Sequence, residues 1–181
     1  MFQVARRLHE ALGGRFEFHH CGAADPERFA EFAAIAPFTI RHGTLRADEV
    51  ATVMRRCHMG ILVSHFEGMP CFLLELLASG RPFTGIRLAQ FDQMVEQGVS
   101  GRMADRGGSD AESEDRVVAA TLAQWDDIRA GRIDPMRVHD KIVPWSVDRQ
   151  LGRLFDAHRA VAGATRAGRR VAPHEKLVPP A

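Results

Sequence analysis

A continuous apolar run, Met59–Ser64 (MGILVS), constrains the fold more than any other feature of the sequence. A strand with one solvated face alternates apolar and polar residues, whereas an uninterrupted run is typical of a parallel strand covered on both faces. Further strands are predicted at Arg15–Cys21, Phe38–His42, Pro82–Ile86 and Gly101–Ala104. Helical periodicity fills the segments between them. This alternation predicts an α/β fold, a Rossmann-like parallel sheet with helices on both faces.

Helices are predicted where apolar residues recur at spacings of three and four. They cover Phe2–Leu12, Pro26–Ala36, Ala47–Cys57, Cys71–Ser79, Phe91–Gln97, Asp115–Ala130, Pro135–Lys141 and Pro144–Ala162. In the second of them, Phe29, Phe32 and Ala33 are expected to face inward. Arg106–Glu114 is predicted to be an exposed loop. Residues 1–163 are expected to form one domain, and the small, basic, proline-containing segment 164–181 a disordered tail.

The composition narrows the classes of function. A formal net charge of +1 gives no global reason to expect nucleic-acid binding. No apolar run approaches the roughly 18 residues of a membrane span, and the N-terminal segment lacks the apolar core of a signal peptide. The three cysteines contain no CxxC pair, and each has apolar neighbours, so buried free thiols are expected. These features favour a cytoplasmic protein.

Two glutamates stand out in the segment Glu67–Gly80 (EGMPCFLLELLASG). Glu75 lies in a helix that is apolar nearly all round, which predicts a buried helix. Because a carboxylate is rarely buried without a partner, a polar ligand is one candidate for that partner. The helix dipole or an internal arginine is the other candidate, and the local pattern does not choose between them.

The residues before this helix favour a ligand. Gly68 allows the backbone to approach a ligand without a Cβ in the way. Pro70 has no N–H, so the amides of Cys71, Phe72 and Leu73 are expected to be free at a helix N-terminus, where they suit a diphosphate. The loop also follows the end of a buried parallel strand, where ligands of open α/β sheets bind. With two carboxylates to accept hydrogen bonds from vicinal hydroxyls, this is a site for a sugar nucleotide.

The segment ILVSHFEGMPCFLLELLASGRP, in which seven residues separate Glu67 from Glu75, resembles the E-x7-E signature of family four retaining glycosyltransferases, which have the GT-B fold. The order is similar beyond the pair, with ASGRP and then VEQGVSGRM downstream. FEFHHCG, FTIRHGTLRADEVATVMRRC and PWSVDRQLGRLF are similar to further units of the family. The resemblance runs from about Phe2 to Ala160 and is strongest in Ile61–Gly101.

The resemblance implies the C-terminal, donor-binding domain of such an enzyme, which transfers a hexose-type sugar with retention to a glycan or lipid acceptor. Glu67 would contact the donor sugar hydroxyls and position the anomeric carbon, as the catalytic residue. Glu75 would hold the ribose hydroxyls. The backbone amides that bind the sugar and diphosphate would come from Gly68, Met69, Pro70, Cys71, Phe72 and Leu73, in which Pro70 itself has no N–H. No metal and no cofactor beyond the nucleotide-sugar substrate is implied.

Two family elements are expected to be missing. The family's donor domain opens with a strand ending in Gly-Arg and a loop bearing a phosphate-binding Lys, whereas this chain begins inside the next helix. In the strand order 3-2-1-4-5-6 that strand is central, so the strands at Phe16 and Ile61 would each be left with an unpaired edge. The acceptor domain is the second element. The chain is therefore expected to be a fragment, a truncated reading frame or half of a split enzyme, inactive without a separate acceptor-domain polypeptide.

Other readings remain open. A non-catalytic GT-B-like module, or a truncated pseudo-enzyme, would keep the fold without the chemistry, and a sugar-nucleotide epimerase is a more distant possibility. His65, Glu67 and Cys71 do not have the spacing of a known zinc site. His19 and His20 are adjacent in a strand and point to opposite faces, which favours solvent-face or edge histidines over a metal site.

Overall fold

The computed structural model describes residues 1–166 and divides the chain into two units, Met1–Val143 and Pro144–Ala181. The first unit contains every strand of the described chain. Strand and helix alternate along it, so the predicted α/β class is confirmed. No described helix is long and apolar enough to cross a membrane.

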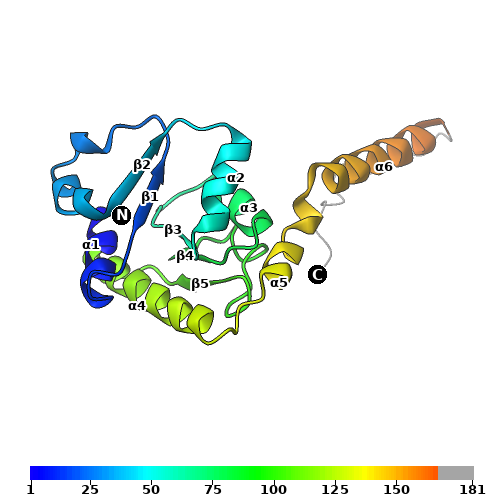
Figure 1. The fold of residues 1–181 in the computed structure, drawn as a ribbon. Coiled ribbons are helices and arrows are strands. Elements are labelled where there is room, and N and C mark those ends of the chain that lie inside the picture. Colours follow the sequence, from blue (N-terminus) through cyan, green and yellow to red (C-terminus); the bar gives the residue numbers. More distant parts are fainter. Residues whose placement is uncertain (167–181) are drawn as a thin grey trace. The chain divides into compact units, whose positions relative to one another are not determined.

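The strands form two parallel sheets instead of one. β1 (Phe18–Cys21) pairs with β2 (Thr39–Gly43), and a separate sheet has the order β3 (Gly60–Leu62), β4 (Phe83–Ile86), β5 (Gly101–Ala104) (Figure 1). β1 and β3 are edge strands, each paired on one side only within residues 1–166. The predicted unpaired edges at these two strands are therefore confirmed.

Five α-helices belong to the first unit: α1 (Phe2–Ala11), α2 (Ala47–Arg56), α3 (Cys71–Ala78), α4 (Asp110–Arg129) and α5 (Pro135–Asp140). Most of their bounds fall within one or two residues of the prediction, because glycine and proline mark them clearly. Gly80, for example, follows α3 with φ +69°, a left-handed conformation that favours glycine after a helix.

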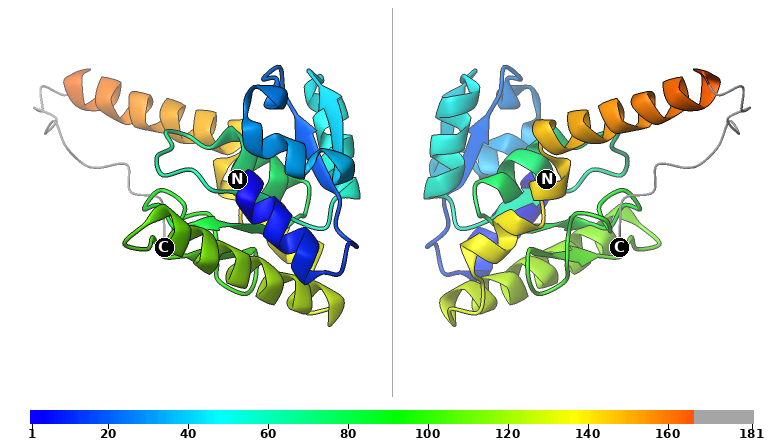
Figure 2. Two further views of the ribbon diagram at one scale, coloured as in Figure 1. Left: turned by 90° about the vertical axis from the view of Figure 1, so that its left-hand side faces the viewer. Right: turned by 90° about the vertical axis from the view of Figure 1, so that its right-hand side faces the viewer.

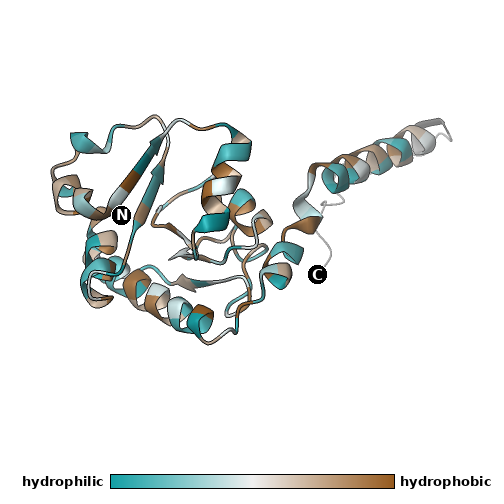
Figure 3. Ribbon diagram, in the orientation of Figure 1, coloured by the Kyte–Doolittle hydropathy of each residue, from teal (hydrophilic) through white to brown (hydrophobic). Residues whose placement is uncertain are grey.

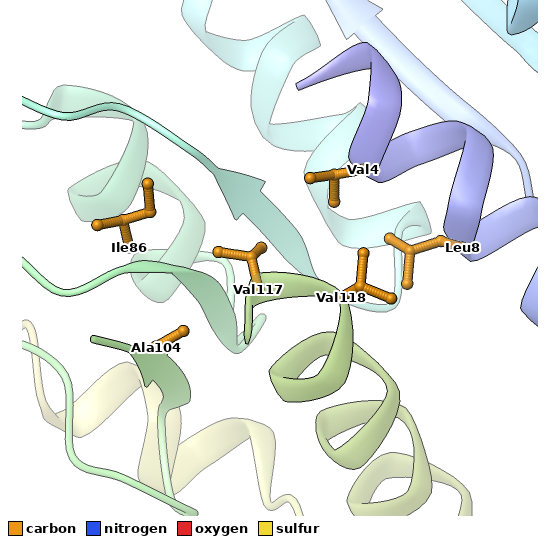
Figure 4. Packing of buried hydrophobic residues seen from close by; sticks show 6 residues of the cluster. All are labelled: Val4, Leu8, Ile86, Ala104, Val117 and Val118. Carbon is orange, nitrogen blue, oxygen red and sulfur yellow. The ribbon is translucent and has the colours of Figure 1, made fainter. Parts of the chain in front are cut away.

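The main core lies where α1 and α4 meet the three-stranded sheet. Its buried side chains come from α1, β4, β5 and α4, and in Figure 4 they are Val4, Leu8, Ile86, Ala104, Val117 and Val118. α1 lies beside α4 in both views of Figure 2. The sequence spacing of Val4 and Leu8 explains this contact, since residues four apart occupy one helix face.

A second cluster joins α1 to the two-stranded sheet. Ala5 packs with the buried Phe32 and Ile35, and Phe16 and Phe18 of the β1 segment cover them. Ala5 is next to Val4, so α1 buries adjacent faces against the two sheets. This helix is the element that holds the two sheets together.

The strand predicted at Arg15–Cys21 begins only at Phe18, and three other predicted segments are wrong. Pro26–Ala36 is not an α-helix but part of three short 3₁₀ helices, η1 (Pro26–Arg28), η2 (Ala30–Ala34) and η3 (Ala36–Phe38). Phe29 interrupts them with an extended backbone, φ −107° and ψ 124°. Of the three side chains expected to face inward, only Phe32 is buried, while Phe29 and Ala33 are exposed.

The other two boundary errors lie around β5. Phe91–Gln97 forms hydrogen-bonded turns, not a helix, because a seven-residue segment ending at Gly98 offers little beyond the costly first turn. α4 begins at Asp110, inside the predicted loop Arg106–Glu114. The hydroxyl of Ser109 accepts a hydrogen bond from the Glu112 amide and so caps the helix five residues earlier than expected.

Within the described residues, the second unit contains α6 (Val147–Arg166), which begins after the predicted start at Pro144 and ends after the predicted end at Ala162. The short 3₁₀ helix η4 (Val143–Trp145) precedes it. Teal and brown alternate along α6 in Figure 3, as expected for a helix with polar and apolar residues interspersed. The predicted tail 164–181 stays a prediction, since residues 167–181 lie outside the described residues.

Candidate functional site

The predicted site begins in the loop between β3 and α3. Within it Glu67 is half-buried, and its backbone carbonyl accepts a hydrogen bond of 2.5 Å from Nε2 of Gln90. The side chains of Phe66 and Met69 are exposed, by 86% and 58%. Gln90 thus anchors an otherwise open loop. Sequence analysis missed this residue, because nothing in the turn after β4 indicates a contact with Glu67.

Gly68 lies in the open part of this loop. Its φ is not positive, and a Cβ added there would meet no protein atom within 4 Å. The protein itself therefore does not require glycine at this position. The space beside its backbone is free for a ligand, as the sequence analysis expected of this residue.

The N-terminus of α3 has two free amides, not three. The Cys71 N–H donates to the Met69 carbonyl at 2.9 Å, so the prediction of a free Cys71 amide is wrong. The turn at Met69–Cys71 uses that donor before the helix starts. Among residues 1–166, the Phe72 and Leu73 amides have no hydrogen-bond partner, as expected in the first turn of a helix. These two donors, with the positive end of the helix dipole, can bind an anion.

Glu75 is exposed, so the prediction that α3 buries it is wrong. The helix buries Leu73, Leu76 and Leu77 on one face, and Glu75 lies on the other. The apolar residues flanking Glu75 in sequence misled the prediction, because the uncovered side of α3 faces a cavity and not a packed layer. Burial therefore gives no reason for this carboxylate to need a partner.

Neither carboxylate of the predicted pair has a partner within the described part of the protein. In the described part of the chain, the Glu67 and Glu75 side chains take part in no hydrogen bond or ion pair. The internal arginine that was the alternative partner of Glu75 is thus not found there. Both groups remain available as hydrogen-bond acceptors for hydroxyl donors.

A cavity of about 940 Å³ lies in the first unit and includes part of the predicted site. Glu75 and Phe72 of α3 line it, whereas Glu67 is not among its lining residues. His20 and Cys21 of β1 also line it. The structure therefore brings Glu75 into the cavity and leaves Glu67 in the loop beside it.

Cysteine and histidine side chains do not gather into a metal site in the part of the chain described here, where no group of three potential ligands is found. His65 lies near Asp110 instead, with Nε2 3.7 Å from the carboxylate. Cys21 and Cys71 are exposed and only Cys57 is half-buried, which corrects the expectation of three buried thiols.

His19, in contrast, has a partner that the sequence did not suggest. Its Nδ1 lies 3.0 Å from Nε2 of His42 on the paired strand β2, although the residue in register with His19 is Ile40. The rings are stacked with centroids 5.3 Å apart. Burial lowers the pKa of His19, and the neighbouring His42 lowers it further.

A family model described as "Glycosyl transferases group 1" matches residues 1–121, more than half of the chain. The chain therefore belongs to this family of glycosyltransferases. The recognition made from the sequence is confirmed at this level. A comparison with curated proteins finds no match.

Solved structures of glycosyltransferases have the same fold. The pneumococcal O-GlcNAc transferase GtfA, in complex with UDP and GlcNAc, matches with a TM-score of 0.69 and 17% identity over 88% of this chain. The lipopolysaccharide outer core galactosyltransferase WaaB, in its apo form, matches with a TM-score of 0.62 and 17% identity over 87% of this chain. TarM matches with a TM-score of 0.62 and 14% identity over 86%.

The matched region is only part of each neighbour. This chain covers 32% of GtfA, 45% of WaaB and 31% of TarM. At these identities the comparisons establish the fold, that of a GT-B glycosyltransferase domain. The whole enzymes' substrates and partners are not carried over by them.

Proposed function

We propose that this domain binds the nucleotide-sugar donor of a retaining glycosyltransferase that transfers a hexose-type sugar to a glycan or lipid acceptor. One observation carries the proposal: unpartnered donors and acceptors converge on one segment. Within residues 1–166, the Phe72 and Leu73 amides and the Glu67 and Glu75 carboxylates have no protein partner. A sugar diphosphonucleoside carries the complementary groups, anionic phosphates and vicinal hydroxyls.

The residues have distinct roles in this proposal. The Phe72 and Leu73 amides bind the diphosphate, and the open backbone at Gly68 and Met69 contacts the sugar. Glu67 accepts hydrogen bonds from the sugar hydroxyls and orients the anomeric carbon for attack, which makes it the catalytic residue. Glu75, which lines the cavity, accepts from the ribose hydroxyls. Pro70 is buried and fixes the start of α3.

The donor is the only small molecule that the proposal requires, and we expect neither a metal ion nor a resident cofactor. GtfA, whose fold is similar, was solved with UDP and GlcNAc, which supports a nucleotide and a sugar as components of the ligand. Transfer also requires an acceptor site, which we expect an acceptor domain to supply. We expect the protein to act in the cytoplasm, where nucleotide sugars are its substrates.

Calorimetric titration tests the proposal. The full 181-residue chain is titrated with UDP-, GDP- and ADP-sugars, and one of these donors is expected to bind. Glu75→Ala should weaken that binding about tenfold, because a hydrogen bond to a charged group contributes about 1.5–3 kcal/mol. Glu10→Ala is the matched control, since Glu10 is exposed on α1 and is not among the residues that line the cavity.

Two results would refute the proposal. One is the absence of binding of any donor by the wild-type chain. The other is a Glu75→Ala variant that binds as tightly as the control. Glu67→Gln separates the roles, since it should reduce transfer in the completed enzyme far more than it reduces donor affinity.

A non-catalytic GT-B-like module is the alternative. The cavity beside Glu75 favours this alternative. An active site needs a dry, preorganised environment, whereas Glu75 borders an open cavity. Donor binding without transfer after addition of an acceptor-domain polypeptide would identify such a module.

A further inference from the structure

Gln90 lies in a turn that is fixed on both sides to the three-stranded sheet. The Arg87 N–H, directly after β4, donates to the carbonyl of the last β5 residue at 2.8 Å. The Phe91 N–H donates to the Leu88 carbonyl at 2.8 Å and so closes the turn. Phe91 itself is fully buried, and its ring lies edge-on to that of Phe83 with the centroids 5.4 Å apart. The backbone on both sides of Gln90 is therefore held by the core.

Two ion pairs restrict the same turn. The Arg87 guanidinium lies 2.6 Å from the Asp92 carboxylate, just beyond the turn, and 2.9 Å from the Asp105 carboxylate, just beyond β5. A single exposed ion pair adds little stability, but here one guanidinium joins the two ends of the turn to each other and to the neighbouring strand. These contacts set the position of Gln90 independently of its contact with Glu67.

The Glu67–Gly68 peptide unit, in contrast, makes one hydrogen bond within residues 1–166, from Nε2 of Gln90 to the Glu67 carbonyl at 2.5 Å. Phe66 and Met69 on either side of this unit are exposed, so their packing does not hold it. Glycine at position 68 adds conformational freedom, which makes rotation of the peptide unit easy when the bond is absent. Gln90 therefore determines how this unit is oriented.

The orientation of this unit sets the direction of one backbone donor. The described residues contain no cis peptide bond, so the Glu67 carbonyl and the Gly68 N–H point in opposite directions across a planar unit. Because the carbonyl points to Gln90, the Gly68 N–H points away from the turn. This N–H has no hydrogen-bond partner in the part of the chain that the structure describes, and the space beside Gly68 is open.

We propose that Gln90 is a positioning residue for the donor sugar. It directs the Gly68 N–H, and the backbone that carries the Glu67 carboxylate, toward the sugar hydroxyls. The donors to the diphosphate, the Phe72 and Leu73 amides, belong to α3 and do not depend on this bond. Gln90 therefore contributes to recognition of the sugar and not of the nucleotide. The inference rests on the proposed function and adds a residue to it.

The test compares each nucleotide sugar with the nucleoside diphosphate that lacks the sugar. UDP-glucose and UDP, GDP-mannose and GDP, and ADP-glucose and ADP are titrated into the full 181-residue chain by calorimetry. Gln90→Met keeps the length of the side chain and removes the donor. For the pair that binds, the variant should lose about three- to tenfold in affinity for the nucleotide sugar, as expected for one hydrogen bond, and no more than about twofold for the diphosphate.

Two further variants complete the design. Gln93→Met is the matched control, because Gln93 is exposed in the same segment and its side chain makes no hydrogen bond within residues 1–166. It should bind both ligands like the wild type. Gln90→Asn shortens the side chain, so that its amide no longer reaches the Glu67 carbonyl. It should behave like Gln90→Met, and it replaces that variant in the test if Gln90→Met folds poorly.

A measurement without ligand separates positioning from general damage. The heteronuclear NOE of the Gly68 amide reports motion on the picosecond to nanosecond timescale, and it should fall in Gln90→Met while the values for Phe72 and Leu73 stay unchanged. An unchanged Gly68 amide, or equal affinity changes for nucleotide sugar and diphosphate, would overturn the inference and leave the proposed function standing. A wild-type chain that binds none of the nucleotide sugars would refute the proposed function, and the inference with it.

Discussion

Asp127 is a buried carboxylate that ties β5 to the end of α4. Its two oxygens accept from Arg102 and Arg132, with nitrogen–oxygen distances of 2.6 Å and 2.7 Å. Burial on its own raises the pKa of Asp127, but the hydrogen bonds from Arg132 and Arg102 outweigh it and hold the pKa below its usual value. Such a group stabilises the fold in its charged form.

Replacing this carboxylate with the isosteric amide should destabilise the protein. We expect Asp127→Asn to lower the free energy of unfolding by about 1–2 kcal/mol, less than for a fully buried pair because water can still reach both arginines. The difference should be complete at pH 7 and shrink as the pH falls below about 4, since a lowered pKa contributes stability only above the unfolded-state value. Urea unfolding at several pH values measures it. Asp126→Asn, an exposed neighbour with the same charge change, should have little effect, and an equal loss in both variants would contradict the assignment.

The His19–His42 pair gives a prediction about protonation. The pKa of His19 should lie below the usual value of about 6.5, so its neutral form is favoured in the folded state. The stability that this shift contributes is present above that value and is lost as the pH falls. We expect His42→Gln to raise the pKa of His19 toward the usual value without fully restoring it, because burial remains. Imidazole NMR titration measures both; an unchanged midpoint in the variant would exclude His42 as a cause.

The environment predicted for Glu75 is wrong, since the side chain is exposed. Its apolar neighbours in the eight-residue helix α3 predicted burial. Which face of α3 is buried, however, depends on packing partners that are far away in the sequence. The prediction of a free Cys71 amide failed for a local reason, because this N–H donates to the Met69 carbonyl. The position of Gln90 against Glu67 depends on tertiary structure alone, so no local pattern could reveal it.

At the scale of elements, α1 is the most important helix for the core, because it packs against both sheets. Leu8 is fully buried in its main cluster. Leu8→Ala should therefore lower the free energy of unfolding by about 2–4 kcal/mol, as for other buried leucines. Chemical denaturation checks this, with Leu151→Ala as a control at a position that is 45% exposed. A loss of under about 1 kcal/mol at Leu8 would mean that α1 is not central to the core.

Elements with a clear local pattern were predicted well, and elements that depend on tertiary context were not. β5 was predicted at Gly101–Ala104 without error, and α2 to within one residue. Pro26–Ala36 has helical periodicity, but Pro37 disfavours a helical conformation of the residue before it. The backbone is also extended at Phe29. The early start of α4 has a local signal, Ser109 three residues before Glu112, which marks a capped helix N-terminus.

At the scale of the whole molecule, the strand order is the most informative result. The family resemblance predicted unpaired edges at the strands near Phe16 and Ile61, and the two separate sheets confirm them. The strand pattern could not show that α1 packs against both sheets through two separate clusters. Nor could it show that both edges border a single cavity.

The central claim is that the N-terminus of α3 binds the diphosphate of a nucleotide sugar. The most direct measurement is the backbone amide NMR spectrum of the full chain during titration with UDP or another nucleoside diphosphate. The account predicts that the Phe72 and Leu73 amides shift most, because they are the donors without a protein partner, while the Cys71 amide, already bonded to Met69, shifts less. Shifts confined to other parts of the chain, with Phe72 and Leu73 unmoved at saturation, would contradict it.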